Sequence, residues 1–127
     1  MNREELVAKN RLGKTVFNNE HIESNFTNED LSNLTFNKCC IVGDFSGANL
    51  TNTVFTECNL KTCIFKYANI NEAQFSSNLL EATDFSFVQY ENLIFTQNFA
   101  YSLTVNLDNI NILKLNETLG FNIYEVE

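Results

Sequence analysis

The sequence predicts an all-β fold in which one chain of 127 residues winds as a four-sided β-helix of about five coils behind a short N-terminal capping helix. Three observations predict this fold. Bulky apolar residues recur every five positions, phenylalanine alternates with other apolar residues along that series, and two shortened spacings fall at one corner of successive coils. Hydrophobic residues make up 44% of the chain and charged residues 19%, which is typical of a globular domain and not of a disordered one.

The five-residue period fits neither common secondary structure. Residues five apart on an α-helix lie about 140° from one another, so the series would spread around the helix surface. A simple strand has a period of two. The series consists of Phe45, Leu50, Phe55, Leu60, Phe65, Ile70, Phe75, Leu80, Phe85, Tyr90 and Phe95, and it continues more weakly through Ala100, Val105, Ile110 and Leu115.

Assigning the series to four faces gives a coil of about twenty residues with two opposed phenylalanine ladders and two aliphatic ladders on the other diagonal. The shortened spacings, Ile22 to Phe26 and Ile41 to Phe45, then fall at the same corner of consecutive coils. A repeat protein tolerates such a change where neighbouring coils share it. This agreement favours four faces over three. The predicted phenylalanine ladders are Phe17, Phe36, Phe55, Phe75 and Phe95 on one face and Phe26, Phe45, Phe65 and Phe85 on the other.

Several segments resemble pentapeptide repeats, whose consensus is Ala-Asp/Asn-Leu-any-any with Phe allowed at the centre. The resemblance is strong from about 24 to 97 and weaker to 115, and it implies a right-handed quadrilateral β-helix. It also implies that the small residue two positions before each centre points inward. The best matches are residues 48–52, 58–62, 68–72 and 73–77.

We divide the single domain, 1–127, into an N-terminal cap at 1–13, coils at 14–117 and a C-terminal tail or edge strand at 118–127. Asn2 followed by Glu5 predicts a helix start, and Gly13 predicts its end. The end of the chain alternates apolar and polar residues like an edge strand, and we expect it to pair with a second copy in a homodimer. The expected dimer strand includes Phe121, Ile123 and Tyr124.

The formal net charge of −8 disfavours direct binding to nucleic acid or to anionic membranes and favours protein partners. The first residues are charged and unlike a secretory signal, and no stretch approaches the roughly 18 apolar residues that cross a bilayer. With four cysteines and no signal, the chain is predicted to be cytoplasmic with reduced thiols.

No set of residues predicts catalysis, a metal site or a cofactor. His21 is the only histidine and is interpreted as a surface or capping residue. Cys39 and Cys58 should point inward in adjacent coils about 4.8 Å apart, with Cys63 one corner on and Cys40 pointing outward. The inward thiols take small-residue positions, which favours packing over a disulfide or a zinc site.

Two outward surfaces are candidates for function. One is a column of outward apolar residues with a neighbour on the same face, which is either covered by the C-terminal tail or forms a protein-binding or dimer surface. The other is the face that carries Asp30, Glu72 and Glu91, which we call the fourth face. Its outward residues include no Lys or Arg, and it is either a solvated polar wall or an imitation of duplex DNA. The column and its neighbour consist of Ile64, Tyr67, Phe87 and Leu107. The acidic residues of the fourth face are Asp30, Glu72 and Glu91.

The resemblance implies a non-enzymatic function, since known pentapeptide-repeat proteins include DNA mimics that bind type II topoisomerases and protect them from drugs or toxins. The leading hypothesis is therefore an acidic DNA mimic that binds DNA gyrase or another nucleic-acid enzyme and protects or inhibits it. The alternative is a scaffold that holds an unknown protein through the aromatic column. Binding by a mimic should weaken steeply with salt, whereas an apolar contact should survive about 0.5 M salt.

Overall fold

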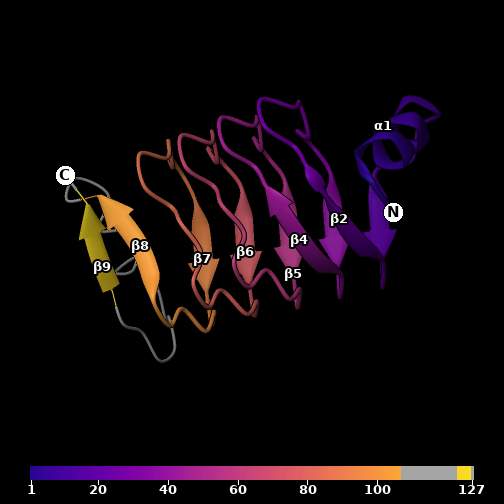
Figure 1. The fold of residues 1–127 in the computed structure, drawn as a ribbon. Helices are drawn as coiled ribbons and strands as arrows, with labels where there is room; N and C mark the ends of the chain where they lie inside the picture. Colours follow the sequence, from indigo (N-terminus) through magenta and orange to yellow (C-terminus); the bar gives the residue numbers. More distant parts are fainter. Residues whose placement is uncertain (107–122, 127) are drawn as a thin grey trace.

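The computed structural model describes residues 1–106 and 123–126, and its strands stack in parallel as a β-solenoid of about four turns with helix α1 (Arg3–Arg11) at one end (Figure 1). The predicted all-β fold with a short N-terminal helix is confirmed. Sheets of the described residues run in the orders β1-β3-β5-β6-β7, β2-β4 and β8-β9. The strands are β1 (Val16–Asn18), β2 (His21–Asn25), β3 (Thr35–Asn37), β4 (Cys40–Asp44), β5 (Val54–Thr56), β6 (Gln74–Ser76), β7 (Ile94–Thr96), β8 (Leu103–Asn106) and β9 (Ile123–Val126).

The register of the five-stranded sheet places the first phenylalanine ladder as the sequence predicts. Phe17 pairs with Phe36, Phe36 with Phe55, Phe55 with Phe75, and Phe75 with Phe95. The step along this ladder is 19 residues for the first two pairs and 20 for the next two. The change in step follows from the two coils that are one residue short.

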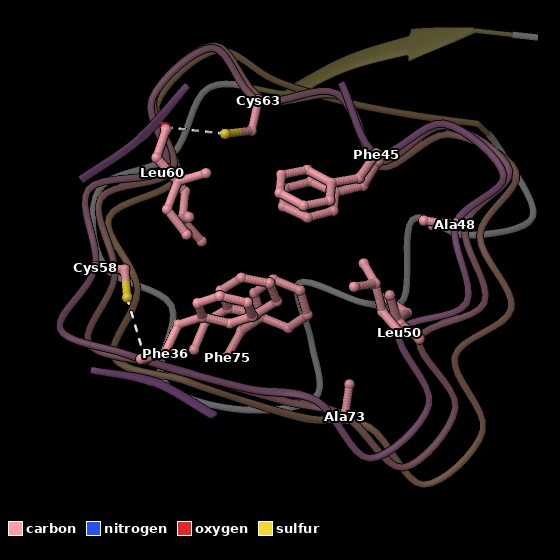
Figure 2. Packing of buried hydrophobic residues seen from close by; sticks show 14 of the residues in the cluster. Phe36, Phe45, Ala48, Leu50, Cys58, Leu60, Cys63, Ala73 and Phe75 are labelled. Carbon is pink, nitrogen blue, oxygen red and sulfur yellow. Dashed lines mark hydrogen bonds between the residues drawn. The ribbon is translucent and has the colours of Figure 1, made fainter. Parts of the chain in front are cut away.

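Stacked aromatic rings fill the interior (Figure 2). Within one ladder the rings are nearly parallel, as in Phe45 and Phe65 at a centroid distance of 5.1 Å and an angle of 5°. Rings of opposite ladders meet edge to face, as in Phe55 and Phe65 at 6.1 Å and 78°. Both arrangements suit the ring quadrupole and add about 0.5–1.5 kcal/mol per pair beyond burial. Side chains such as Leu50 and Leu60 fill the other two walls of the core (Figure 2).

Asp or Asn before a centre residue stabilises the following turn. The Asp44 carboxylate accepts a hydrogen bond from the Ser46 N–H at 2.9 Å, and the Asn69 side-chain oxygen accepts one from the Asn71 N–H at 3.0 Å. Short side chains with an oxygen reach a backbone N–H two residues on, which explains why Asp and Asn recur at this position.

The two shortened spacings become continuous strand at one corner. β2 and β4 each run through five residues and pair in register from His21↔Cys40 to Asn25↔Asp44. In the next two coils the same corner is a turn, with left-handed backbone at Thr62 (φ 66°) and Ala82 (φ 58°). The predicted irregular corner is therefore a change from straight strand to turn between the second and third coils.

The N-terminal helix begins and ends as expected. The Asn2 side-chain oxygen accepts a hydrogen bond from the Glu5 N–H at 2.9 Å, and Gly13 follows the helix with a φ of 98°. Leu6 is buried and joins the hydrophobic core. The backbone of Met1 pairs with β2, donating to the His21 carbonyl at 2.7 Å and accepting from the Glu23 N–H at 3.0 Å.

At the other end, β9 lies parallel to β8 with Leu103 opposite Ile123, a step of twenty residues that equals one coil. Of the predicted dimer strand, Ile123 and Tyr124 therefore belong to a strand that extends the stack (Figure 1). Phe121 and Leu107 lie outside the described residues. Among the helices described, none has the length and apolar character needed to cross a membrane.

Candidate functional site

Two aromatic rings stack on the outside of the solenoid at one corner. Tyr67 and Phe87 occupy equivalent positions in adjacent coils, with ring centroids 5.1 Å apart and an angle of 13° between the ring planes. Tyr67 is 59% exposed and Phe87 is half-buried. The Lys66 Nζ lies 5.5 Å from the Tyr67 centroid and 5.9 Å from that of Phe87. This pair matches the outward column that the sequence predicts.

The backbone holds these two rings in a fixed place. Both residues have left-handed backbone, with φ of 62° at Tyr67 and 57° at Phe87. The Tyr67 N–H donates to the Ser86 carbonyl at 3.0 Å, and the Phe87 N–H donates to the buried Asn106 side-chain oxygen at 2.7 Å. Left-handed backbone is unfavourable for aromatic residues, so the hydrogen bonds between coils must maintain it.

Ile64 lies three residues before Tyr67 in the same coil and is 37% exposed. Its backbone forms isolated parallel β-bridges with Asp44 in the preceding coil and with Asp84 in the following one. We call Ile64, Tyr67 and Phe87 the aromatic stripe. The fourth predicted member, Leu107, falls outside the described residues.

The described part of the C-terminus does not run along the stripe. Residues 123–126 form β9, which pairs with β8, and Tyr67 keeps an exposed fraction of 59%. The interpretation in which the tail covers the column therefore finds no support in this segment.

The acidic face, which we define by Asp30, Glu72 and Glu91, places its three carboxylates in different coils. Parallel bridges connect Asp30 to Asn49 and Asn49 to Asn69, so amide side chains separate the carboxylates along the stack. The Glu72 N–H donates to the Glu91 carbonyl at 2.7 Å, which places these two residues in neighbouring coils.

The Asp30 carboxylate also accepts hydrogen bonds within the turn that follows it. Hydrogen bonds from the hydroxyl and backbone of Ser32 hold the pKa of the Asp30 carboxyl below its usual value. The acidic face is therefore an amide-rich surface with three separated charges.

The cysteines contribute packing and hydrogen bonds. Cys39, Cys58 and Cys63 are buried, Cys40 is half-buried, and all four are free thiols. The Cys58 Sγ donates to the Phe36 carbonyl at 3.2 Å (Figure 2). Burial raises the pKa of Cys63 to about 12, which keeps this thiol neutral near pH 7.

No group of three metal-ligating side chains lies together in residues 1–106 and 123–126. His21 is exposed, with its Nε2 3.6 Å from a Glu23 carboxylate oxygen. It therefore stands at the surface, as the sequence indicates.

The buried amides of Asn78 and Asn98 were not predicted from the sequence. Both side chains are fully buried and hydrogen-bonded to one another and to the backbone. The sequence signal for these amides is their position, since Asn78 and Asn98 follow Cys39 and Cys58 in one inward column. In the structure, all four side chains donate a hydrogen bond to a carbonyl of the preceding coil.

Comparison with protein families matched residues 44–77 to the model of pentapeptide repeats, in eight copies. The resemblance to pentapeptide-repeat proteins is confirmed. The pentapeptide-repeat fold also appears in HetL, a protein involved in heterocyst differentiation regulation from the cyanobacterium Nostoc sp. strain PCC 7120, with a TM-score of 0.72 and 18% identity. The match covers 84% of this chain and 47% of HetL, so the chain spans about half of that protein. At this identity the likeness shows the fold alone.

Two further pentapeptide-repeat structures are more distant. The protein alr5209 from Nostoc PCC 7120 is 16% identical, with a TM-score of 0.46 over 97% of this chain and 96% of its own. QnrB1, a plasmid-mediated fluoroquinolone resistance protein, is 16% identical in a trypsin-treated form, with a TM-score of 0.39 over 84% of this chain and 59% of its own. With TM-scores of 0.46 and 0.39, these two likenesses carry no functional argument. The search of curated proteins found no match.

Proposed function

We propose that this protein is a non-enzymatic interaction module that binds a protein partner through the aromatic stripe. The observation that carries the proposal is the outward stack of the exposed Tyr67 ring on the half-buried Phe87 ring, beside the exposed Ile64. Exposed apolar surface gains about 25 cal/mol for each Å² that a partner removes from water. Aromatic residues are also the type most often found at the energetic centre of protein interfaces.

The solenoid makes this stripe a rigid binding surface. Side chains of Tyr67 and Phe87 project from corners whose backbone is hydrogen-bonded on to the next coil. Few groups of the solenoid would therefore become ordered on binding, and most of the loss of conformational entropy would occur in the partner. Lys66 adds a positive charge beside the rings, which gives the contact a preferred orientation.

A second candidate function, an acidic DNA mimic, is favoured by the acidic face. Its supporting observation is the set of three carboxylates on a face whose outward residues include no Lys or Arg from Asp30 to Glu91, a range that the structure describes in full. The partner would be DNA gyrase or another nucleic-acid enzyme, which the protein would protect or inhibit without binding nucleic acid itself.

Charge density places this candidate second. Asp30 and Glu91 lie three coil steps apart, or roughly 14 Å at about 4.8 Å per step. Duplex DNA carries about eight phosphate charges over such a length, at about one per 1.7 Å. The acidic face presents three carboxylates. The net charge of −8 belongs to the whole chain, and Lys38 and Lys61 pair with glutamates on other faces.

One experiment separates the two functions. DNA supercoiling by gyrase is measured with the wild-type protein at increasing molar excess and with an Asp30→Asn, Glu72→Gln, Glu91→Gln variant. A DNA mimic should alter supercoiling and lose this effect in the variant. An interaction through the stripe predicts unchanged supercoiling, and binding that persists at about 0.5 M salt and disappears with Phe87→Asp.

Dimerisation through the C-terminal strand is a separate proposal. Among the described residues β9 pairs with one neighbour, β8, so its sheet is two-stranded there. A strand edge of this kind can pair with a second copy. Light scattering at micromolar concentration tests it, and a monomeric mass would refute it.

A further inference from the structure

A groove crosses the outside of the solenoid where the straight corner of the second coil meets the turn of the third. It is lined by Val42 and Gly43 of β4, by Thr62 and Ile64 of the next coil, and by the acidic residues Glu23 and Asp44. We call this surface the step groove. Val42 is 43% exposed and Ile64 is 37% exposed, so its apolar part is open to solvent.

The sequence creates the groove by omitting one residue at the same corner of two coils. β2 and β4 pass straight through this corner, whereas the third coil turns at Thr62 with a φ of 66°. Gly43 allows the straight passage, since a Cβ there would lie 3.0 Å from the Ser24 carbonyl oxygen and 3.2 Å from the Phe45 ring. A five-residue spacing in the second coil would place a turn here and fill the step.

The two charged residues that line the groove, Glu23 and Asp44, are both acidic. Glu23 is well exposed, with 70% of its side chain accessible, and among the described residues no Lys or Arg lines the groove. Two lysines of the next coil contact other groups. Lys61 pairs with Glu81 at 3.8 Å, and Lys66 lies over the rings of Tyr67 and Phe87.

The His21 imidazole lies 3.6 Å from the Glu23 carboxylate, but its ring is exposed and its charge depends on protonation. The groove therefore combines an apolar part with two carboxylates. A cationic side chain placed there would meet opposite charge, whereas an anionic one would be repelled.

We propose that the step groove binds an extended segment of the partner protein in which an Arg or Lys is followed two residues later by an aliphatic residue. Residues i and i+2 of an extended chain point to the same side, so both would face the groove. The cation would lie between Glu23 and Asp44, and the aliphatic side chain would contact Val42 and Ile64. The inference rests on the proposed function, because Ile64 belongs to both the step groove and the aromatic stripe.

The first arm of the test uses fluorescein-labelled heptapeptides and fluorescence polarisation. The probe is Gly-Arg-Ser-Leu-Ser-Arg-Gly, compared with peptides in which Glu replaces both Arg or Ser replaces Leu. We expect the probe to bind at least about tenfold more tightly than either comparison peptide, with amide shifts in NMR spectra at Val42 and Ile64. Equal affinities of the three peptides, or no binding of the probe at millimolar protein, would overturn the proposal.

The second arm locates the peptide-binding site by comparing two variants that each remove two negative charges, one pair at the groove and one pair on another face. Glu23→Gln with Asp44→Asn should weaken probe binding about tenfold or more, whereas Glu72→Gln with Glu91→Gln removes the same charge from another face and should leave it within about twofold. The turn after Asp44 should survive in the first variant, because Asn49 accepts the same hydrogen bond from Thr51 at 3.1 Å. Equal weakening in both variants would mean that net charge alone attracts the peptide, and the proposal would be wrong.

A third arm distinguishes this inference from the proposed function. Once a partner is known, Tyr67→Ser and the Glu23→Gln, Asp44→Asn variant are compared for binding to that full-length partner. Loss with Tyr67→Ser and full retention with the groove variant would support the stripe and refute the groove. Loss with the groove variant and full retention with Tyr67→Ser would support the groove and refute the stripe.

Discussion

The Asn78 Nδ2 donates a hydrogen bond to the Asn98 Oδ1 at 3.1 Å in the interior of the solenoid. Each amide also donates to a backbone carbonyl, Asn78 to Phe55 at 2.9 Å and Asn98 to Phe75 at 2.8 Å. The Asn98 oxygen further accepts the Asn78 N–H at 3.0 Å. The two side chains thus hydrogen-bond to one another and to buried backbone groups of neighbouring coils.

Removing one of these amides should destabilise the protein strongly. Asn98→Ala removes the hydrogen bonds to the Phe75 carbonyl, to the Asn78 N–H and to the Asn78 Nδ2, and each buried group left unsatisfied costs about 1–3 kcal/mol. We expect a loss of about 2–5 kcal/mol in the free energy of unfolding, measured by urea denaturation. Asn98→Cys should lose less, because Cys58 in the same column still donates to a carbonyl. An unchanged urea midpoint for Asn98→Ala would contradict this role.

Gly43 should tolerate no larger residue. An added Cβ would lie 3.0 Å from the Ser24 carbonyl oxygen, a backbone atom that cannot move away easily. Gly43→Ala should therefore reduce the free energy of unfolding by about 1–3 kcal/mol. Val42→Ala changes the exposed neighbour on the same strand and should cost about 0.5 kcal/mol or less. Equal midpoints in urea for wild type and Gly43→Ala would show that the corner can widen.

The four thiols should differ in reactivity in the folded protein. Cys40 is half-buried, whereas Cys39, Cys58 and Cys63 are buried. At pH 8 we expect Ellman's reagent to modify about one thiol per native chain and all four after unfolding in guanidinium, since the reagent does not reach buried thiols. Cys40→Ser should abolish the native reaction. Rapid modification of two or more thiols in the native protein would refute this assignment.

Replacing the exposed rings should leave the fold intact. Phe87 has a φ of 57°, and Asp adopts this left-handed backbone more readily than Phe does. Phe87→Asp should therefore change the free energy of unfolding by about 1 kcal/mol or less, because it removes one exterior stacking contact. Circular dichroism and urea unfolding measure this effect. A loss of several kcal/mol would assign the ring to stability and not to binding.

Much of the fold was readable from the sequence because inward side chains repeat with the coil. Phe17, Phe36 and Phe55 stack in the predicted ladder, and the short spacing at Ile41 fell at the predicted corner. The sequence did not reveal that this spacing produces a groove. A depression depends on the height of the neighbouring turn at Thr62, which lies in another coil.

The sequence predicted where the residues of the candidate site lie on the coil, but not whether they are exposed. The outward column at Tyr67 and Phe87 followed from periodicity, but its exposure depends on where the end of the chain runs, which periodicity does not determine. The hydrogen bonds of Asn78 were missed for a related reason. Inward polar residues count as irregularities in a hydrophobic pattern, and only the carbonyl positions in the preceding coil show that they are satisfied.

The central claim is that the aromatic stripe binds a protein. Its most direct test begins with affinity capture from an extract of the natural host at about 0.5 M salt. The affinity of each captured protein is then measured for three forms of the solenoid. These are the wild type, Phe87→Asp, and the Asp30→Asn, Glu72→Gln, Glu91→Gln variant of the acidic face. We predict a partner that binds the wild type and the acidic-face variant equally and binds Phe87→Asp at least about tenfold more weakly. Partners that bind Phe87→Asp as tightly as the wild type, or that are lost only from the acidic-face variant, would contradict the claim.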